Sequence, residues 1–258
     1  MDFSVFTYNT LFGNGQNALK KIYEKHRPDI VCLQEINTSP SSLQEIEKLG
    51  YTLADYSNAF IKFNKIFGVA TFYNPATVKA TSSNSISLPT GFFDVLAYII
   101  RIFKLGRKTR TVLESQFLHL KSGNKIVIAN VHFSPFGTNG IRLKQLKKTI
   151  KEISSYDDKP TIIAGDFNFT YGRKRLEECI REFNFKEATN TILSTVQGKI
   201  SGQNFIEKFG SYIINKLFRD KWKMDYMFYK NCSVISSETL NSTFSDHLPI
   251  LSHFKFNE

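Results

Sequence analysis

Short apolar runs of strand length alternate along the chain with stretches whose apolar residues recur at helical spacing. Runs rich in Val, Ile and Phe are typical of strands that are covered on both faces. Strands are predicted at 3–6, 30–33, 111–120, 125–131, 161–164, 224–229 and 250–256. Helices are predicted at 16–26, 42–50, 139–154 and 173–183. This order predicts sheets packed face to face with helices outside.

Local signals mark some of these boundaries. Ser122-Gly123-Asn124 lies between two strands and indicates a hairpin turn. Ser42 with Glu45 fits a capping box at the start of the second helix. In the helix at 139–154, apolar residues face one way, and we expect Arg142 among the basic residues on the solvent side.

Length and composition favour one domain over residues 1–258. The chain has 258 residues, of which 41% are hydrophobic, and no Pro/Gly/Ser-rich linker divides it. No secretory signal is visible at the start, so a cytoplasmic location is expected. Three widely spaced cysteines, Cys32, Cys179 and Cys232, favour reduced core thiols over a disulfide framework or a zinc site.

Polar residues follow several of the apolar runs, at the point where each strand is expected to end. Carboxylates, amides and imidazoles gathered at strand ends are typical of a metal-dependent hydrolytic site, because a strand buried on both faces does not itself tolerate acids. These groups are Asn9, Gln34-Glu35, Asn130-Val131-His132, Gly165-Asp166-Phe167-Asn168, Asp225-Tyr226 and Ser245-Asp246-His247. Three other histidines, His26, His119 and His253, lie away from them and are expected to be structural or exposed.

The net charge of +11 is concentrated in one region. Residues 101–151 contain twelve Lys or Arg and a single acid, Glu114. Such asymmetry favours a polyanionic partner such as nucleic acid, although a solvated helix face is the alternative explanation. The segments at 92–103 and 203–218 are strongly apolar but too short to span a bilayer. They would pack on the sandwich or meet a membrane surface.

Taken together, the polar groups resemble the endonuclease/exonuclease/phosphatase superfamily, which includes DNase I-like nucleases, exonuclease III-like enzymes and neutral sphingomyelinases. Gly165-Asp166-Phe167-Asn168 with Ser245-Asp246-His247-Leu248-Pro249 carries the resemblance most strongly, and Trp222-Lys223-Met224-Asp225-Tyr226 adds to it. The resemblance implies an α/β fold, a four-layered sandwich of two mixed sheets with helices outside. It also implies hydrolysis of phosphate esters assisted by Mg²⁺, with Mn²⁺ as an alternative ion.

The resemblance also implies a role for each residue type. Asn9, Glu35 and Asp246 would supply oxygen ligands to the metal, and His247, oriented by Asp225, would be the base that deprotonates water. Asp166 and Asn168 would position the water and a phosphate oxygen. His132 would donate to the phosphate or protonate the leaving oxygen, and Arg110 would bind phosphate.

At two positions the sequence differs from particular branches of the family. Exonuclease III-like members usually carry a tyrosine where this chain has His132, and repair members carry an acid where it has Leu11. A nuclease acting on DNA or RNA is the first hypothesis, because of the basic region. A lipid or small-molecule phosphodiesterase at a membrane surface is the alternative. A silent binding module is disfavoured because each polar group is present, and no obligate protein partner is evident.

Overall fold

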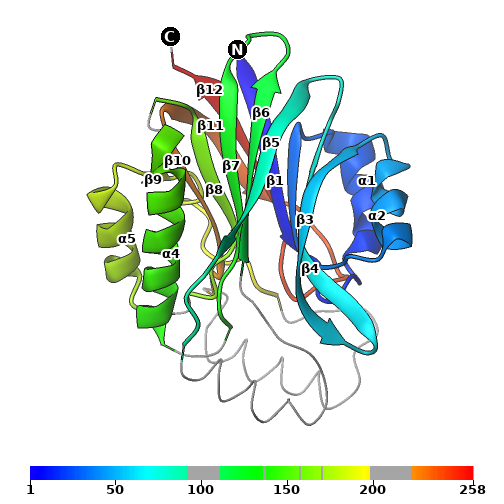
Figure 1. The fold of residues 1–258 in the computed structure, drawn as a ribbon, viewed down its shortest axis with the longest axis horizontal. Coiled ribbons are helices and arrows are strands. Elements are labelled where there is room, and N and C mark those ends of the chain that lie inside the picture. The colour runs from blue at the N-terminus through cyan, green and yellow to red at the C-terminus, as the bar shows by residue number, and fades with distance from the viewer. Residues whose placement is uncertain (92–110, 136–137, 157, 170, 198–221, 258) are drawn as a thin grey trace.

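Two six-stranded β-sheets pack face to face, and pairs of helices cover their outer faces (Figure 1). The computed structural model describes residues 1–91, 111–135, 138–156, 158–169, 171–197 and 222–257. The apolar segments 92–103 and 203–218, and Arg110, lie outside the described residues.

The elements follow one another in mixed order along the chain. They are β1 (Asp2–Asn9), α1 (Gln16–His26), β2 (Ile30–Asn37), α2 (Pro40–Glu47), β3 (Thr52–Lys62), β4 (Lys65–Tyr73), β5 (Val78–Ser87), β6 (Thr111–His119), β7 (Lys125–His132), α4 (Asn139–Ile153), η1 (Ser154–Tyr156), β8 (Thr161–Asp166), α5 (Arg173–Glu182), β9 (Lys186–Glu187), β10 (Asp225–Lys230), β11 (Cys232–Thr239) and β12 (Ile250–Phe256).

The first sheet has the order β11-β12-β1-β2-β4-β3, and the second has the order β5-β6-β7-β8-β10-β9. In each sheet one central pair is parallel, β1 with β2 and β7 with β8, and the other described pairs are antiparallel. Helices α1 and α2 lie on the outer face of the first sheet, and α4 and α5 lie on that of the second (Figure 1). The predicted four-layered sandwich of DNase I-like type is therefore confirmed.

Alternation along the strands builds the layers. Val5 faces the other sheet and packs with Ile128 and Ile162, whereas its neighbour Phe6 packs beneath α1 with Leu19. Because successive side chains point to opposite faces, a central strand that is covered on both sides must be apolar at nearly every position. This explains the continuous apolar runs in the sequence.

A fully buried pair of amides connects the two sheets across the apolar layer between them. The side-chain amide of Gln34 on β2 donates to Oδ1 of Asn130 on β7 at 2.7 Å, and both residues are fully buried. Asn130 in turn donates to the carbonyl of Ala70 at 3.0 Å. Buried amides are tolerated only when they are hydrogen bonded, so this pair fixes the two sheets relative to each other.

The structure differs from the sequence prediction at several elements. Five strands, β3, β4, β5, β9 and β11, had not been predicted. Four of them are edge strands, whose exposed side chains weaken the apolar pattern. Helix α2 begins earlier than expected, because Ser39 is its N-cap and accepts the backbone N–H of Ser42 at 3.4 Å. The capping box at Ser42 was therefore wrong.

Arg142 was also placed wrongly. It is buried, not on the solvent side of α4. Its guanidinium donates to the carbonyls of Ser134 and Pro135, both at 2.9 Å, and to Oδ1 of Asn139 at 2.7 Å. These acceptors compensate the cost of removing the charge from water.

Candidate functional site

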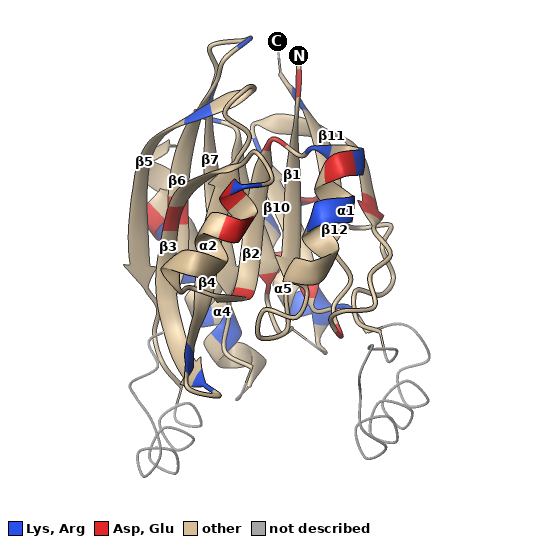
Figure 2. Ribbon diagram, turned by 90° about the vertical axis from the view of Figure 1, so that its right-hand side faces the viewer, with Lys and Arg blue, Asp and Glu red and all other residues tan. Residues whose placement is uncertain are grey.

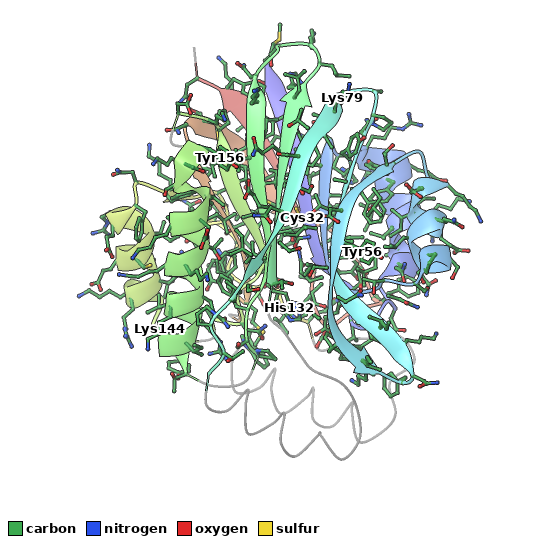
Figure 3. All side chains as sticks on the ribbon, in the orientation of Figure 1. Cys32, Tyr56, Lys79, His132, Lys144 and Tyr156 are labelled. Atoms are coloured by element: carbon green, nitrogen blue, oxygen red, sulfur yellow. The ribbon has the colours of Figure 1, made fainter. Side chains whose placement is uncertain are left out.

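The polar residues at the strand ends meet at one edge of the sandwich. Asn9, His132 and Asp166 are the last residues of β1, β7 and β8, and Asp225 is the first residue of the antiparallel β10. His247 lies in the loop before β12. In Figure 3, His132 marks this edge, at the end of the molecule opposite the two chain termini of Figure 1.

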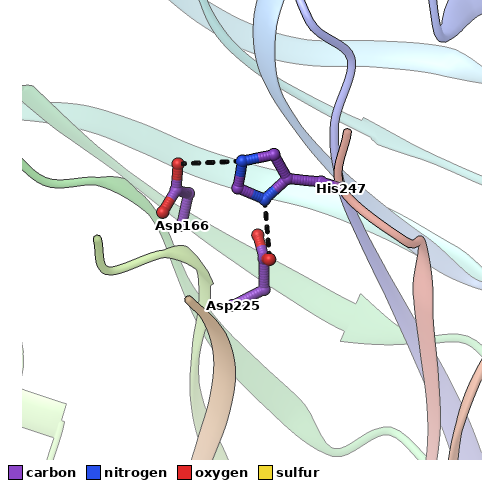
Figure 4. Close-up of side chains that lie close together, drawn as sticks. All are labelled: Asp166, Asp225 and His247. Atoms are coloured by element: carbon purple, nitrogen blue, oxygen red, sulfur yellow. Dashed lines mark hydrogen bonds and ion pairs between the residues drawn. The ribbon is translucent and has the colours of Figure 1, made fainter. Parts of the chain in front are cut away.

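A histidine lies between two carboxylates at the centre of this edge (Figure 4). His247 Nδ1 donates to Asp225 Oδ2 at 2.7 Å, and its Nε2 lies 3.9 Å from Asp166 Oδ2. All three side chains are buried. Asp225 therefore fixes the orientation of the imidazole and leaves Nε2 directed at Asp166, where a proton can be taken up or given.

A second histidine connects this triad to Glu35. His132 Nε2 lies 3.7 Å from Asp166 Oδ2 and 3.7 Å from Glu35 Oε1. Asn9 Nδ2 donates to Asp166 Oδ2 at 3.0 Å. Asp166 is thus in contact with side chains from both sheets, and six of the predicted site residues form one continuous cluster.

The backbone at this edge adopts conformations that most residues avoid. Glu35 has φ 52°, and the register of β2 with β4 shifts between Gln34 and Ile36, so Glu35 is the extra residue of a β-bulge. Bulges redirect a side chain relative to the regular strand. Gly165 has φ +145°, and a Cβ there would lie 2.0 Å from the carbonyl oxygen of Val131. Only glycine allows β7 and β8 to approach this closely beside Asp166.

Charge and burial shift the pKa values within the triad. Burial raises the pKa of Asp166 from 3.8 to about 6, although the neighbouring His247 opposes the shift. For His247, burial lowers the pKa, but the charges of Asp225 and Asp166 outweigh it and raise the pKa well above its ordinary value of 6.5. The protonation of Asp166 therefore depends on that of His247.

Thr195 supports the triad, and the sequence analysis missed it. Its Oγ1 accepts the backbone N–H groups of Met224 and Asp225, each at 3.0 Å, and its carbonyl accepts the N–H of Leu248 at 2.7 Å. Thr195 thus joins the start of β10, which carries Asp225, to the loop that carries His247. Nothing in the pattern around a single buried threonine indicates this contact.

Ser245 makes a similar connection to the first sheet. Its hydroxyl donates to the carbonyl of Asn9 at 2.8 Å and accepts the backbone N–H of His247 at 3.1 Å. The sequence analysis included Ser245 in a polar group without giving it a role. The hydrogen bonds indicate that it holds the His247 loop against the end of β1.

Two predicted site residues lie at the margin of the cluster. Asp246 is half-buried, and its Oδ1 lies 3.4 Å from the hydroxyl of Ser245. Asn168 donates from its side chain to the carbonyl of Phe133 at 3.2 Å, and its backbone N–H donates to Asp166 Oδ1 at 2.8 Å. The structure thus places Asn168 directly behind Asp166, whereas Asp246 borders the His247 loop.

The remaining histidines occupy the positions expected for structural residues. His119, at the end of β6, is buried and contacts the hydroxyl of Ser122 at 2.8 Å. His26 ends α1, and His253 lies in β12. The three cysteines are buried free thiols, as predicted.

Comparison with known proteins decides the family. The profile of the Endonuclease/Exonuclease/phosphatase family matches residues 6–247, which span the whole cluster from Asn9 to His247. The chain belongs to this family.

Several known proteins are similar to the chain. A UPF0294 protein of Vibrio cholerae is 25% identical over 259 residues, covering 98% of this chain and 78% of its own. The human Nocturnin catalytic domain with bound sulfate superposes with a TM-score of 0.73 at 18% identity, covering 99% of this chain and 95% of its own. A mannosyl-6-phosphatase of Bacteroides thetaiotaomicron superposes with a TM-score of 0.69 at 17% identity, covering 98% and 100%.

The residues present fit the divalent metal on which the Endonuclease/Exonuclease/phosphatase family generally depends. Asp166, Asp225 and His247 offer ligand atoms that lie within 4.8 Å of one another. Glu35 adds a carboxylate 3.7 Å from His132. Asn9 directs its Nδ2 at Asp166 and its Oδ1 accepts the backbone N–H of Leu11 at 3.1 Å, so its amide would have to turn to offer an oxygen. A donor set in which oxygen predominates suits Mg²⁺ or Mn²⁺ better than a soft metal. Among the described residues, no helix is long and apolar enough to cross a membrane.

Proposed function

We propose that the protein is a Mg²⁺-dependent phosphodiester hydrolase that cleaves DNA or RNA. The observation that carries the proposal is the continuous contact from Glu35 through His132 and Asp166 to His247 and Asp225, at one edge of a fold shared with phosphoesterases. Water attack on a phosphodiester needs a base on one side and stabilisation of negative charge on the other. The cluster contains groups for both.

Each side chain has a task that its position supports. His247, oriented by Asp225 at 2.7 Å, takes the proton of the attacking water at Nε2, and Asp166 and Asn168 orient that water. His132 donates to a phosphate oxygen or to the leaving oxygen. We place Arg110 among the phosphate-binding groups, as the family resemblance implies.

Glu35 and Asn9, with Asp246, would hold the metal. When bound, it would neutralise charge on the phosphate and offset the carboxylate charge that raises the pKa of His247. This set of ligands would suit Mg²⁺, and Mn²⁺ would replace it with little change of ligand geometry.

The basic region supports a nucleic-acid substrate. Residues 101–151 carry twelve Lys or Arg against one Glu, and this asymmetry would favour the binding of a polyanion. The burial of Arg142 removes one cation from the surface that we had expected. A phosphodiesterase acting on lipid is the second candidate, favoured by the apolar tip of one hairpin that is described below. The free thiols of the three buried cysteines fit a reducing compartment such as the cytoplasm.

One panel of substrates tests both candidates. The purified protein is incubated with plasmid, single-stranded DNA, RNA and sphingomyelin vesicles, with Mg²⁺ or with EDTA, and Asp166→Asn serves as the inactive control. We expect nucleic-acid cleavage that EDTA and Asp166→Asn abolish. Hydrolysis of the lipid alone would favour the second candidate, and metal-independent cleavage would exclude the mechanism.

A further inference from the structure

The tip of the β3–β4 hairpin, residues 61–66, exposes apolar side chains that the site does not use. Phe63 is 72% exposed, Ile66 is 45% exposed and Ile61 is 37% exposed. Isolated exposed apolar residues are ordinary on a protein surface, but a contiguous group indicates an interaction site. The hairpin projects from the same end of the molecule as His132 (Figures 1 and 3).

The turn holds its aromatic residue in an unfavourable conformation. Phe63 and Asn64 form the two-residue turn, with φ 50° and φ 58°. Two left-handed residues are required in such a turn, and Asn or Gly normally supplies them. A bulky aromatic side chain at this φ is an outlier, and strain of this kind is often retained where it serves a function. Here it keeps an aromatic ring at the outermost point of the hairpin.

Basic residues accompany the apolar ones. Lys62 and Lys65 are direct cross-strand partners, and in Figure 2 the ribbon is coloured for basic residues at this end of the hairpin. The Lys62 ammonium lies 3.3 Å from the ring centre of Phe12 and 4.9 Å from that of Phe63. These rings hold the charge in place by cation–π contact. From residue 56 to residue 93 the sequence contains no Asp or Glu, so the tip suits an anionic partner.

The tip has an exposed apolar face and a basic face, and this decides between partners. Ile61 and Ile66 face each other across the strands on one side, while Lys62, Lys65 and the buried Phe60 and Phe67 lie on the other. A nucleic-acid strand would contact one side of the tip, and isoleucine offers it neither a stacking face nor a hydrogen bond. A lipid headgroup region surrounds an inserted element on all sides, accepts apolar side chains and attracts lysine.

We propose that residues 61–66 insert into the headgroup region of an anionic lipid bilayer and hold the catalytic edge at that surface. Ile61, Phe63 and Ile66 would be buried among the acyl chains and headgroups, and Lys62 and Lys65 would contact anionic lipid. The proposal does not depend on which phosphate ester is cleaved, because binding is measured without turnover.

Vesicle co-sedimentation of the full chain tests the proposal. The probes are vesicles of phosphatidylcholine alone and of phosphatidylcholine mixed with phosphatidylserine. We expect the wild-type chain to sediment with the mixed vesicles. The Ile61→Thr/Phe63→Asn/Ile66→Thr variant should bind them at least about tenfold more weakly. Lys65→Gln should weaken binding to the mixed vesicles only, and added salt should have the same effect.

A matched control removes exposed apolar side chains from elsewhere. Leu120→Thr/Ile235→Thr replaces residues that are 48% and 55% exposed, outside the hairpin, and should leave vesicle binding unchanged. Phe63→Asn alone separates binding from folding, because Asn suits the left-handed turn. It should lower binding without lowering the melting temperature.

Three results would overturn the proposal. In the first, the wild-type chain does not sediment with either vesicle. In the second, the control variant loses as much binding as the tip variant. In the third, the tip variant loses affinity only for a single-stranded oligonucleotide or only self-association, which would assign the tip to nucleic acid or to a second copy of the chain. Phosphoesterase activity on a soluble substrate enters none of these outcomes, so the proposed reaction stands or falls separately.

Discussion

The two ends of the sandwich use the same backbone conformation with different residues. At the end away from the site, left-handed residues are Arg27, Asn184 and Asn231, two of them asparagines that tolerate this region. At the site end two are also asparagines, Asn64 and Asn168, but four are Leu11, Phe12, Glu35 and Phe63, which do not tolerate it. The site end also buries two carboxylates and a histidine together. The candidate site therefore lies where the fold contains disfavoured backbone conformations and buried charge.

The largest effect should come from breaking the triad. His247→Ala and Asp166→Asn should each lower kcat by roughly 10²–10⁴, because proton transfer and water orientation are lost. Circular dichroism should show an unchanged fold. His119→Ala, at the opposite end, is the matched control and should keep full activity. A loss of less than about threefold in His247→Ala would contradict its role as the base.

The same Asp166→Asn substitution should stabilise the metal-free protein. The pKa of Asp166 is raised from 3.8 to about 6 in the fold, so this carboxyl contributes stability below its ordinary pKa and loses it as the pH rises through about 6. Near pH 7 the ionised group costs up to about 3 kcal/mol. Urea unfolding in EDTA should show the gain at neutral pH and little difference near pH 4. An unchanged unfolding free energy at neutral pH would show that burial of the ionised Asp166 does not destabilise the fold.

Removal of one ligand charge should weaken metal binding. Glu35→Gln keeps the size of the side chain but removes the charge that attracts a hard cation, so Mn²⁺ affinity by titration calorimetry should fall by about tenfold or more. Activity should recover in part at high Mg²⁺. Glu114→Gln, an acid on β6, provides the comparison and should bind Mn²⁺ as the wild-type protein does.

Thr195 should affect turnover without affecting substrate binding. Thr195→Val keeps the shape but removes the oxygen that accepts the N–H groups of Met224 and Asp225, so Asp225 should lose its fixed position beside His247. We expect kcat to fall by about tenfold with KM unchanged. Thr195→Ser restores the oxygen and should recover most of kcat. If both variants lose activity equally, the hydroxyl is not the feature that matters.

The smallest effect concerns the turns themselves. Asn231→Phe, at the end away from the site, should lower the unfolding free energy by about 1 kcal/mol, because phenylalanine is disfavoured at φ 60°. Phe63→Asn, at the site end, should raise it by a similar or smaller amount. Thermal melting of the two variants measures both changes. If both substitutions changed the unfolding free energy in the same direction, the two ends would not differ in this respect.

Much of the fold could be predicted from the sequence because burial imposes periodicity. The structure gives α1 and β12 the predicted bounds, and the site residues follow apolar runs because buried strands exclude acids. Domain count is untested and stays a prediction. The edge strands β3, β5, β9 and β11 were missed because many of their side chains are exposed or half-buried, which weakens the apolar pattern.

The rest depends on contacts that local pattern does not contain. Arg142 is buried because carbonyls of the loop at Ser134 and Pro135 accept its hydrogen bonds. Thr195 meets Asp225 across thirty residues of sequence. The metal ligand role of Glu35 was predicted, but the bulge that turns its side chain could not be, because register shifts arise from strand pairing.

The amide pair between the sheets constrains how this sequence can change over evolutionary time. Gln34 donates to Asn130, so replacing either one alone leaves a buried amide group without this hydrogen bond, which costs about 1–3 kcal/mol. Replacing both with apolar residues of the same shape could be nearly neutral for stability. The double change would, however, release the alignment that brings Glu35 and His132, their near neighbours in sequence, to the same site. Substitutions at these two positions should therefore be inherited as a pair or not at all.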